Sequence, residues 1–584
     1  MTLINLLRSQ RFELKTDEIL IIDLAGHLRR TPIRTSNLMD FKHLQSPSFE
    51  TRNEEVRSLQ AVSVIRDAER SINSCELNHP NFNGDVYASL RKGGAVNFFS
   101  RYCIGLVAAT FSSTFSVGCL YSAIQPMLQR HVNFTTNQIA ASERLTSMPL
   151  ILSFVFGLLS DCYPIMGSRR KGYTLVGLVT AVVSIWILAA LNAYAASYET
   201  GKAGVGIAVL VILFGALTSL GNILMYVSTH TRVIELAQRE PLGLRGSILA
   251  TYLIFRCIVY IITDLCIHFS RVSATANSAH QTTTLIVFGV IIALPMPLII
   301  HYWDEKCYSL STSVKCRSQI LWKIMQQKAS WSILLFLCFF TLFNQISFSG
   351  PVLVISVWAG ANEDSFLMQQ SMYYGAMIVT MFVWRSYFMN RSWRAFYLAC
   401  PVLLIVPQLI VSILVSQDIV RNRVFYRIMT LFSSVSAAIG WLGSIVPLTE
   451  IVHEGSEGAI VGLSLSFYFL VMIFVQTNSV GLFEGSNFYD VNEVAADTHE
   501  GRQGVLKSLM LNYGLNAMSI IGLYFLPRQK LDTQQLRCYG GYTKCASSAI
   551  VTFAVILFIY SFVVTIMTFI PEKACLRLIG GTGC

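Results

Sequence analysis

The chain has 584 residues, of which 53% are hydrophobic and only 13% charged, and its mean hydropathy is +0.53. Soluble globular proteins are about 25% charged, so the composition excludes an ordinary soluble domain and predicts an all-α polytopic membrane protein. The formal charge of +11 does not indicate nucleic-acid binding, because no basic run alternates with exposed aromatic residues.

Residues 1–96 form a polar, highly charged tail that we expect to be cytosolic. Its start lacks the basic and apolar regions of a signal peptide, so no cleaved signal is expected. Apolar residues recur at helical spacing over 51–71, which favours a short amphipathic helix, and a largely disordered tail is the alternative.

Thirteen apolar runs follow, each close to the ~20 residues that a helix needs to cross a bilayer. They cover approximately 100–124, 138–160, 173–196, 204–227, 246–268, 283–302, 330–358, 366–388, 395–416, 426–447, 457–480, 503–526 and 547–570. A basic linker over 304–329 separates the first six from the next six, the layout of two six-helix repeats. We predict six-helix lobes over 97–303 and 330–526, and an extra transmembrane helix with flanking segments over 527–584.

The stretch 157–171, GLLSDCYPIMGSRRK, joins the second and third runs. Asp161 lies at the end of one run, and Arg169, Arg170 and Lys171 stand at the start of the next. Because Lys and Arg accumulate in loops that stay inside, this hairpin is predicted to be cytosolic. We interpret the four charged residues as an inner gate that locks two helices in one arrangement. The alternative is a topogenic loop that only fixes orientation.

The distribution of cations sets the predicted orientation. With the N-terminus inside, the inner loops hold eighteen Lys and Arg residues and the outer loops eight. Asn133-Phe134-Thr135 is a glycosylation sequon in the first outer loop, so Asn133 is the expected acceptor. The sequon at Asn390 falls inside and is expected to be unused. Thirteen crossings then put the C-terminus outside.

Ionisable residues inside apolar runs are costly and usually face the bundle interior. In the fifth run, Arg256, Tyr260 and Asp264 follow at spacings of four and share one helix face. Arg256 near mid-depth suits an anionic solute, and the alternative is an Arg–Asp pair that fastens this helix to a neighbour. Glu143 and Arg144 near the outer end of the second run are expected to be mainly structural.

Polar amides mark further candidates for a substrate cavity. Asn344 and Gln345 precede Gly350-Pro351 in the seventh run, where a kink is expected. They are predicted to contact the solute, with interhelical hydrogen bonding as the alternative. Asn222 in the fourth run is a weaker candidate.

The sequence carries no pattern typical of an enzyme. It contains no GxSxG, HExxH or P-loop motif, and its fourteen scattered cysteines show no metal-ligand spacing. We therefore expect no catalysis, no metal and no cofactor.

Three patches carry a resemblance to a known family. They are 157–173 with Pro149 before it, 235–241 with Arg245-Gly246, and 454–458. Over about residues 100–526 the chain resembles the folate–biopterin transporter family, a branch of the major facilitator superfamily. Its thirteenth run and ending resemble expanded members found in oomycetes. The resemblance implies a twelve-helix, two-lobe carrier of pteridines such as folate or biopterin, with proton coupling.

The chain departs from the family at charged positions to which the resemblance assigns substrate or protons. Leu150 and Ser153 stand where the family has Trp and Lys, and Tyr226 and His230 where it has two aspartates. We expect a secondary transporter of a small, perhaps anionic, organic solute in the plasma membrane or an internal membrane. The runner-up is a transport-inactive sensor or scaffold that acts through the N-terminal tail.

Overall fold

The computed structural model describes residues 89–198, 204–273, 278–305, 313–361, 366–479, 481–484 and 488–570, with 573 and 576. The regular elements of these residues are helices, and their only bridges are two isolated ones. The all-α polytopic fold predicted from composition is confirmed. The amphipathic helix predicted over 51–71 lies outside the described residues.

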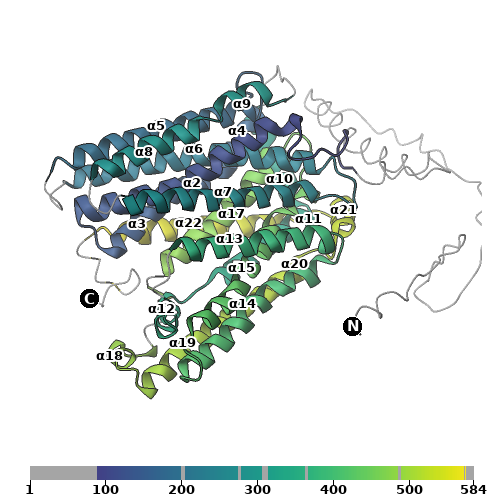
Figure 1. The fold of residues 1–584 in the computed structure, drawn as a ribbon. Coiled ribbons are helices and arrows are strands. Elements are labelled where there is room, and N and C mark those ends of the chain that lie inside the picture. Colours follow the sequence, from purple (N-terminus) through teal and green to yellow (C-terminus); the bar gives the residue numbers. More distant parts are fainter. Residues whose placement is uncertain are drawn as a thin grey trace, which may run out of the picture. The chain divides into compact units, whose positions relative to one another are not determined.

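One group of helices, which we call the N-half, covers the first six predicted runs. It comprises η1 (Arg101–Cys103), α2 (Ile104–Val132), α3 (Thr136–Ser147), η2 (Met148–Leu152), α4 (Ser153–Cys162), α5 (Lys171–Ala195), α6 (Val205–Ala237), α7 (Ser247–Ser273), α8 (Ser278–Ala293) and α9 (Met296–Tyr302). In this group α5 runs beside α6 and α8, and α2 packs on α6 and α7 (Figure 1). Helices α3, η2 and α4 follow each other as a single span, Thr136–Cys162.

A second group, the C-half, follows α10 (Val314–Gln326) of the predicted linker. It comprises α11 (Lys328–Gln345), α12 (Ser349–Trp358), α13 (Phe366–Val383), η3 (Trp384–Phe388), α14 (Trp393–Ser416), α15 (Arg423–Ile445), α16 (Leu448–Ile451), α17 (Glu457–Asn478), α18 (Val491–Ala495), α19 (His499–Ala517) and α20 (Ser519–Phe525). Here α14 packs on α15 and α19, and α11 packs on α20 and α17.

The kink expected in the seventh run is present, but it precedes Gly350-Pro351. Helix α11 ends at Gln345, and α12 begins at Ser349 with a bend of 45°. Pro351 lies in the first turn of α12, where proline is tolerated because its missing N–H has no partner there. The side-chain amide of Asn516 donates to the carbonyls of Phe343 at 2.7 Å and Ile346 at 2.9 Å, which satisfies backbone groups at the break.

In the described part of the chain, ten helices are long and apolar enough to cross a membrane, and two bent pairs raise this number to twelve. Thirteen crossings were predicted. The run 366–388, which forms α13 and η3, is not among the twelve, because Gln369, Gln370, Tyr373 and Tyr374 lower its hydropathy. Helix α13 nevertheless packs between α7 and α15 within the bundle.

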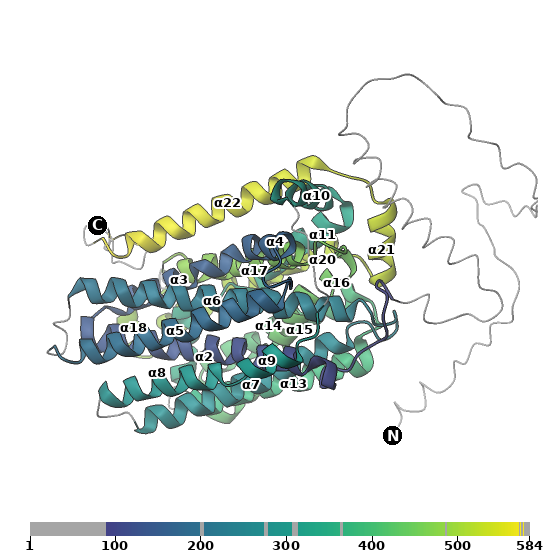
Figure 2. The same ribbon diagram turned by 90° about the horizontal axis from the view of Figure 1, so that it is seen from above.

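Two helices follow the C-half. The short α21 (Lys530–Tyr539) packs on α11 and α16, and α22 (Lys544–Met567) forms the extra predicted span. Helix α22 runs along α17 and also contacts α3, α10 and α11, so it contacts both halves (Figure 2). The hydroxyl of Tyr560 donates to the Asn478 side chain at 2.7 Å, and the Ser547 hydroxyl donates to the Met325 carbonyl at 2.8 Å.

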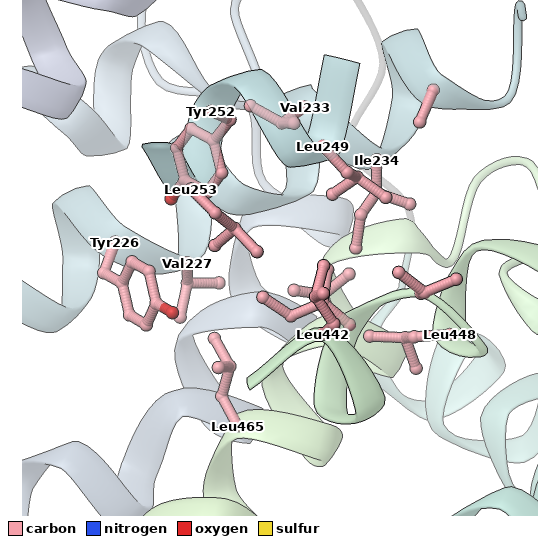
Figure 3. Close-up of a cluster of buried hydrophobic side chains, with 14 of the residues drawn as sticks. Tyr226, Val227, Val233, Ile234, Leu249, Tyr252, Leu253, Leu442, Leu448 and Leu465 are labelled. Atoms are coloured by element: carbon pink, nitrogen blue, oxygen red, sulfur yellow. The ribbon is translucent and has the colours of Figure 1, made fainter. Parts of the chain in front are cut away.

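The two halves meet through α4, η2 and α6 against α17, and through α7 against α13. Buried apolar side chains fill part of this contact. Figure 3 shows Leu249 and Leu253 of α7 above Leu442 of α15, with Leu448 and Leu465 of the C-half beside them. All five side chains are buried, so this layer excludes water between the halves.

Candidate functional site

A cavity of about 730 Å³ is lined by both halves, a volume within the ~300–1,000 Å³ typical of small-molecule sites. Its N-half lining is Val117, Gly118, Gln125, Glu143, Tyr260, Asp264 and Ile267. Its C-half lining is Phe340, Thr341, Asn344, Gln345, Gln370, Tyr373, Tyr374, Met377, Ala437, Gly440, Trp441, Tyr468 and Gln476. Aromatic rings and side-chain amides dominate this wall.

The structure brings three of the predicted cavity residues together. Asp264, Asn344 and Gln345 line the cavity, and Asn344 also accepts a hydrogen bond from the Cys400 thiol at 3.5 Å. Asn222 is not among the lining residues, since its side chain is buried within α6 and its neighbours. Glu143, which was expected to be mainly structural, belongs to the wall.

Arg256 lies one layer behind this wall, enclosed by aromatic rings. Its guanidinium donates to the hydroxyls of Tyr252 at 3.0 Å and Tyr260 at 3.3 Å. The guanidinium carbon lies 4.2 Å from the ring centroid of Tyr226 and 5.9 Å from that of Trp441. Such cation–π contacts stabilise a charge withdrawn from water. Tyr260 and Trp441 separate Arg256 from the cavity that they line.

A buried ion-pair cluster joins the halves at the hairpin of α4 and α5. Arg170 donates to Asp161 at 2.7 Å within the N-half and to Glu457 of α17 at 3.3 Å across the contact. Asp161 in turn accepts from the backbone N–H groups of Gly458 at 3.1 Å and Ala459 at 2.8 Å. A carboxylate at the start of a helix is favoured by the unpaired N–H groups and the dipole of that helix.

Further charges complete the cluster on its N-half side. Glu235 accepts from Arg170 at 3.2 Å and from Arg232 at 2.9 Å. Arg91, which precedes η1, also pairs with Glu457. We call Arg91, Asp161, Arg170, Glu235 and Glu457 the gate cluster. Its carboxylates and guanidiniums alternate, so each buried charge has a partner of opposite sign.

The two other predicted gate cations have different roles. The backbone N–H groups of Arg169, Arg170 and Lys171 donate to the carboxylate of Glu305 at 3.0 Å each, which caps the start of α5. The Lys171 ammonium donates to the carbonyl of Ile300 at 2.6 Å, also within the N-half. Of the three predicted cations, the structure places Arg170 against the C-half.

Glycines let α4 and α17 approach closely beside the gate cluster. A Cβ on Gly157 would lie 1.9 Å from the carbonyl oxygen of Gly458, and one on Gly462 would lie 2.4 Å from that of Ser153. The Phe154 N–H donates to the Ser466 hydroxyl at 2.8 Å across the same crossing. Any larger residue at Gly157 therefore forces the two halves apart.

A second polar contact joins the halves after α6. Arg245 pairs with Glu450 of α16 at 2.9 Å, and both side chains are buried. The Gln238 amide donates to the carbonyls of Thr449 and Val452 at 2.9 Å each. Burial raises the pKa of Glu240 in this loop to about 7. Hydrogen bonds that backbone N–H groups donate to its carboxylate, such as that of Gly246, oppose this rise.

Three of the four residues that depart from the family pattern, Ser153, Tyr226 and His230, are buried in the N-half. The Ser153 hydroxyl donates to the Leu150 carbonyl, so it is used within its own helix. His230 lies between Tyr226 and Tyr252, with ring centroids 5.3 Å and 5.7 Å away. Neither of its ring nitrogens has a hydrogen-bond partner among the described residues. These side chains contribute packing and aromatic surface in place of charge.

The sequon Asn133 is exposed at the turn between α2 and α3, in a left-handed conformation. Asn390 instead donates to the Gly243 carbonyl at 2.8 Å and accepts from Lys530 at 3.1 Å. The described residues contain no cluster of three or more His, Cys, Asp or Glu suited to a metal ion.

Sequence reasoning missed Glu235 and Glu457, which pair with Arg170, and also Arg245 and Glu450, which form a second contact. Glu235, Arg245 and Glu457 all stand in the patches that carry the family resemblance. The signal was that one patch has three consecutive cations at 169–171 while the other two patches offer carboxylates, which indicates mutual pairing.

The comparisons with known proteins concern the family and the fold of the chain. The family model of the BT1 family matches residues 115–526, more than half of the chain. The chain is similar in fold to the proton:xylose symporter XylE of the major facilitator superfamily bound to 6-bromo-6-deoxy-D-glucose, with 13% identity, a TM-score of 0.51, and coverage of 74% of this chain and 96% of that chain. A double-tryptophan XylE mutant gives 11% identity, a TM-score of 0.54, and coverage of 75% and 98%.

No curated protein matches the sequence. The structural likeness shows the fold, and the family match supplies the class of protein. The chain therefore belongs to the BT1 family, the folate–biopterin transporters, and is an integral, multi-pass membrane transporter.

Proposed function

We propose that this protein moves a small organic solute by alternating access of its N-half and C-half, with pteridines such as folate and biopterin as first candidates. The observation that carries the proposal is a cavity lined by both halves, together with ion pairs that cross between them at the hairpin end. In this arrangement the solute reaches the cavity from the opposite end while the gate cluster is closed.

The composition of the gate cluster supports a contact that can open. Arg170, Asp161 and Glu235 all belong to the N-half and pair with each other. When α17 withdraws, these three residues keep their mutual pairs and lose only Glu457 and two backbone donors. Removing one partner of a buried pair costs about 3–5 kcal/mol, and the retained pairs avoid that full penalty.

We further propose that the hairpin end faces the cytosol and that 97–303 and 330–526 are the moving lobes. The excess of cations in the loops of this end supports the orientation. The exposure of Asn133 between α2 and α3 supports an outer loop that is open to glycosylation.

Uptake into proteoliposomes tests the function. Labelled biopterin and folate are supplied outside vesicles that contain the purified protein, with and without an imposed pH gradient. Saturable uptake above empty vesicles supports transport, and stimulation by an inward proton gradient supports proton coupling. Binding of a pteridine to the protein without any flux would contradict transport and favour the sensor or scaffold.

A further inference from the structure

We infer that the cavity selects planar heterocycles that present N–H donors and carry no negative charge, with Asp264 and Glu143 as the residues that reject anions. The inference rests on the proposed function and narrows it: among the pteridine candidates it favours biopterin, which is neutral at pH 7, over folate, which carries ionised carboxylates. It rests on the polarity of the wall and on the arrangement of its rings.

Among the twenty described residues that line the cavity, two are carboxylates and none is Lys or Arg. Asp264 belongs to α7 and Glu143 to α3, so both acidic groups come from the N-half. A carboxylate on the solute would meet like charges in a partly enclosed site, where Coulomb repulsion exceeds that in bulk water.

The two arginines near the wall direct their charges to protein groups. Arg256 donates to Tyr252 and Tyr260, and the ring of Trp441 also covers it. Arg144 donates to the backbone carbonyl of Gln476 at 3.2 Å and is buried. Both arginines partly offset the field of the carboxylates, but neither lines the cavity to receive a solute anion.

Aromatic rings give the wall flat surfaces. Tyr260 of α7 and Tyr374 of α13 stack with centroids 5.1 Å apart and planes 12° apart. Tyr373 stands edge-on to Tyr374 at 5.2 Å and 78°. Stacked and edge-on rings favour a flat solute, whose face packs on one ring while its edge meets polar groups.

The two carboxylates of the wall favour solute donors, because an ionised carboxylate only accepts hydrogen bonds. A carboxylate has about four lone-pair sites and can bind two adjacent N–H groups at two points. The amide oxygens of Asn344, Gln345 and Gln370 add neutral acceptors on the C-half side. A heterocycle with an amino group beside a ring N–H therefore bonds to an N-half carboxylate and a C-half amide together.

Two pterins of similar size test this selection. At pH 7, 6-carboxypterin carries a negative charge, and 6-hydroxymethylpterin is neutral. We expect calorimetry on the protein in lipid nanodiscs to give at least tenfold tighter binding of 6-hydroxymethylpterin. In Asp264→Asn and in Glu143→Gln, measured separately, the ratio should fall below threefold, chiefly because the anion binds better. Glu454→Gln, an exposed carboxylate on the loop before α17, should keep the wild-type ratio.

Each outcome decides the inference. Equal or tighter binding of 6-carboxypterin by the wild type overturns it, and so does an unchanged ratio in both correctly folded variants. Absence of binding for both pterins at millimolar concentration also overturns it. Selective binding without uptake into vesicles would leave the inference standing and contradict the transport proposal.

Discussion

Replacing Asp161 by Asn should open the gate cluster. Asp161 accepts one hydrogen bond from Arg170 and two from the backbone of Gly458 and Ala459, and only these last two cross between the halves. Asn keeps one acceptor oxygen and turns an NH₂ donor toward the other donors. Hydrogen bonds to a charged acceptor are worth about 1.5–3 kcal/mol each, and a carboxylate at a helix start adds up to about 2 kcal/mol.

The closed arrangement should therefore lose about 3 kcal/mol relative to the open one, a shift of about two powers of ten in their ratio. The Arg170–Asp161 pair exists in both arrangements, so its weakening largely cancels in this difference. Because a transporter must revisit the closed arrangement in every cycle, uptake should fall while protein level and membrane insertion stay near wild type.

Spin labels on the two sides of the gate cluster measure this shift. Tyr163 and Glu454 are exposed on hairpin-end loops of the N-half and the C-half. With cysteines there and the native cysteines replaced, Asp161→Asn should move the distance distribution to longer values. Asp490→Asn, at an exposed cap of α18, should not. Wild-type distances together with wild-type uptake would refute the gate, and loss of membrane insertion would show that the hairpin is topogenic.

Two further predictions concern the contact between the halves, and a third concerns the orientation of the chain. Gly157→Ala should lower vesicle uptake at least tenfold, because its methyl group enters the α4–α17 crossing, whereas Gly375→Ala, which has open space around it, should stay within threefold. Arg91→Gln should change the spin-label populations by at most about 1 kcal/mol, since Arg91 is a partly exposed partner of Glu457; a larger shift would make the segment before η1 a principal lock. Protease protection of terminal tags should place the N-terminus and the 304–328 linker on one side and the C-terminus on the other; equal accessibility of both ends would mean that one helix does not span.

The sequence predicted most spans and one half of the gate. The proximity of Asp161 and Arg170 could be predicted because both residues lie in one short hairpin between apolar runs. Their partner Glu457 is far along the chain, and no helical period reports which distant loop it meets. The shared helix face of Arg256 and Tyr260 was also predictable, but not the enclosure of Arg256, because the rings around it come from three different helices. Side-chain packing of that kind is settled only by the tertiary structure.

The extra helix α22 and the residues that flank it make hydrogen bonds to one part of the protein and an apolar contact to another. Its hydrogen bonds run to Asn478 and, near its start, to Met325 and Gln326, while the ring of Phe569 meets Phe134 of the N-half only by apolar contact at 6.0 Å. Directional bonds resist sliding, and contacts without direction permit it. Helix α22 should thus move with α17 of the C-half and with α10 of the linker, and sliding on this flank should occur at the apolar contact between Phe569 and Phe134.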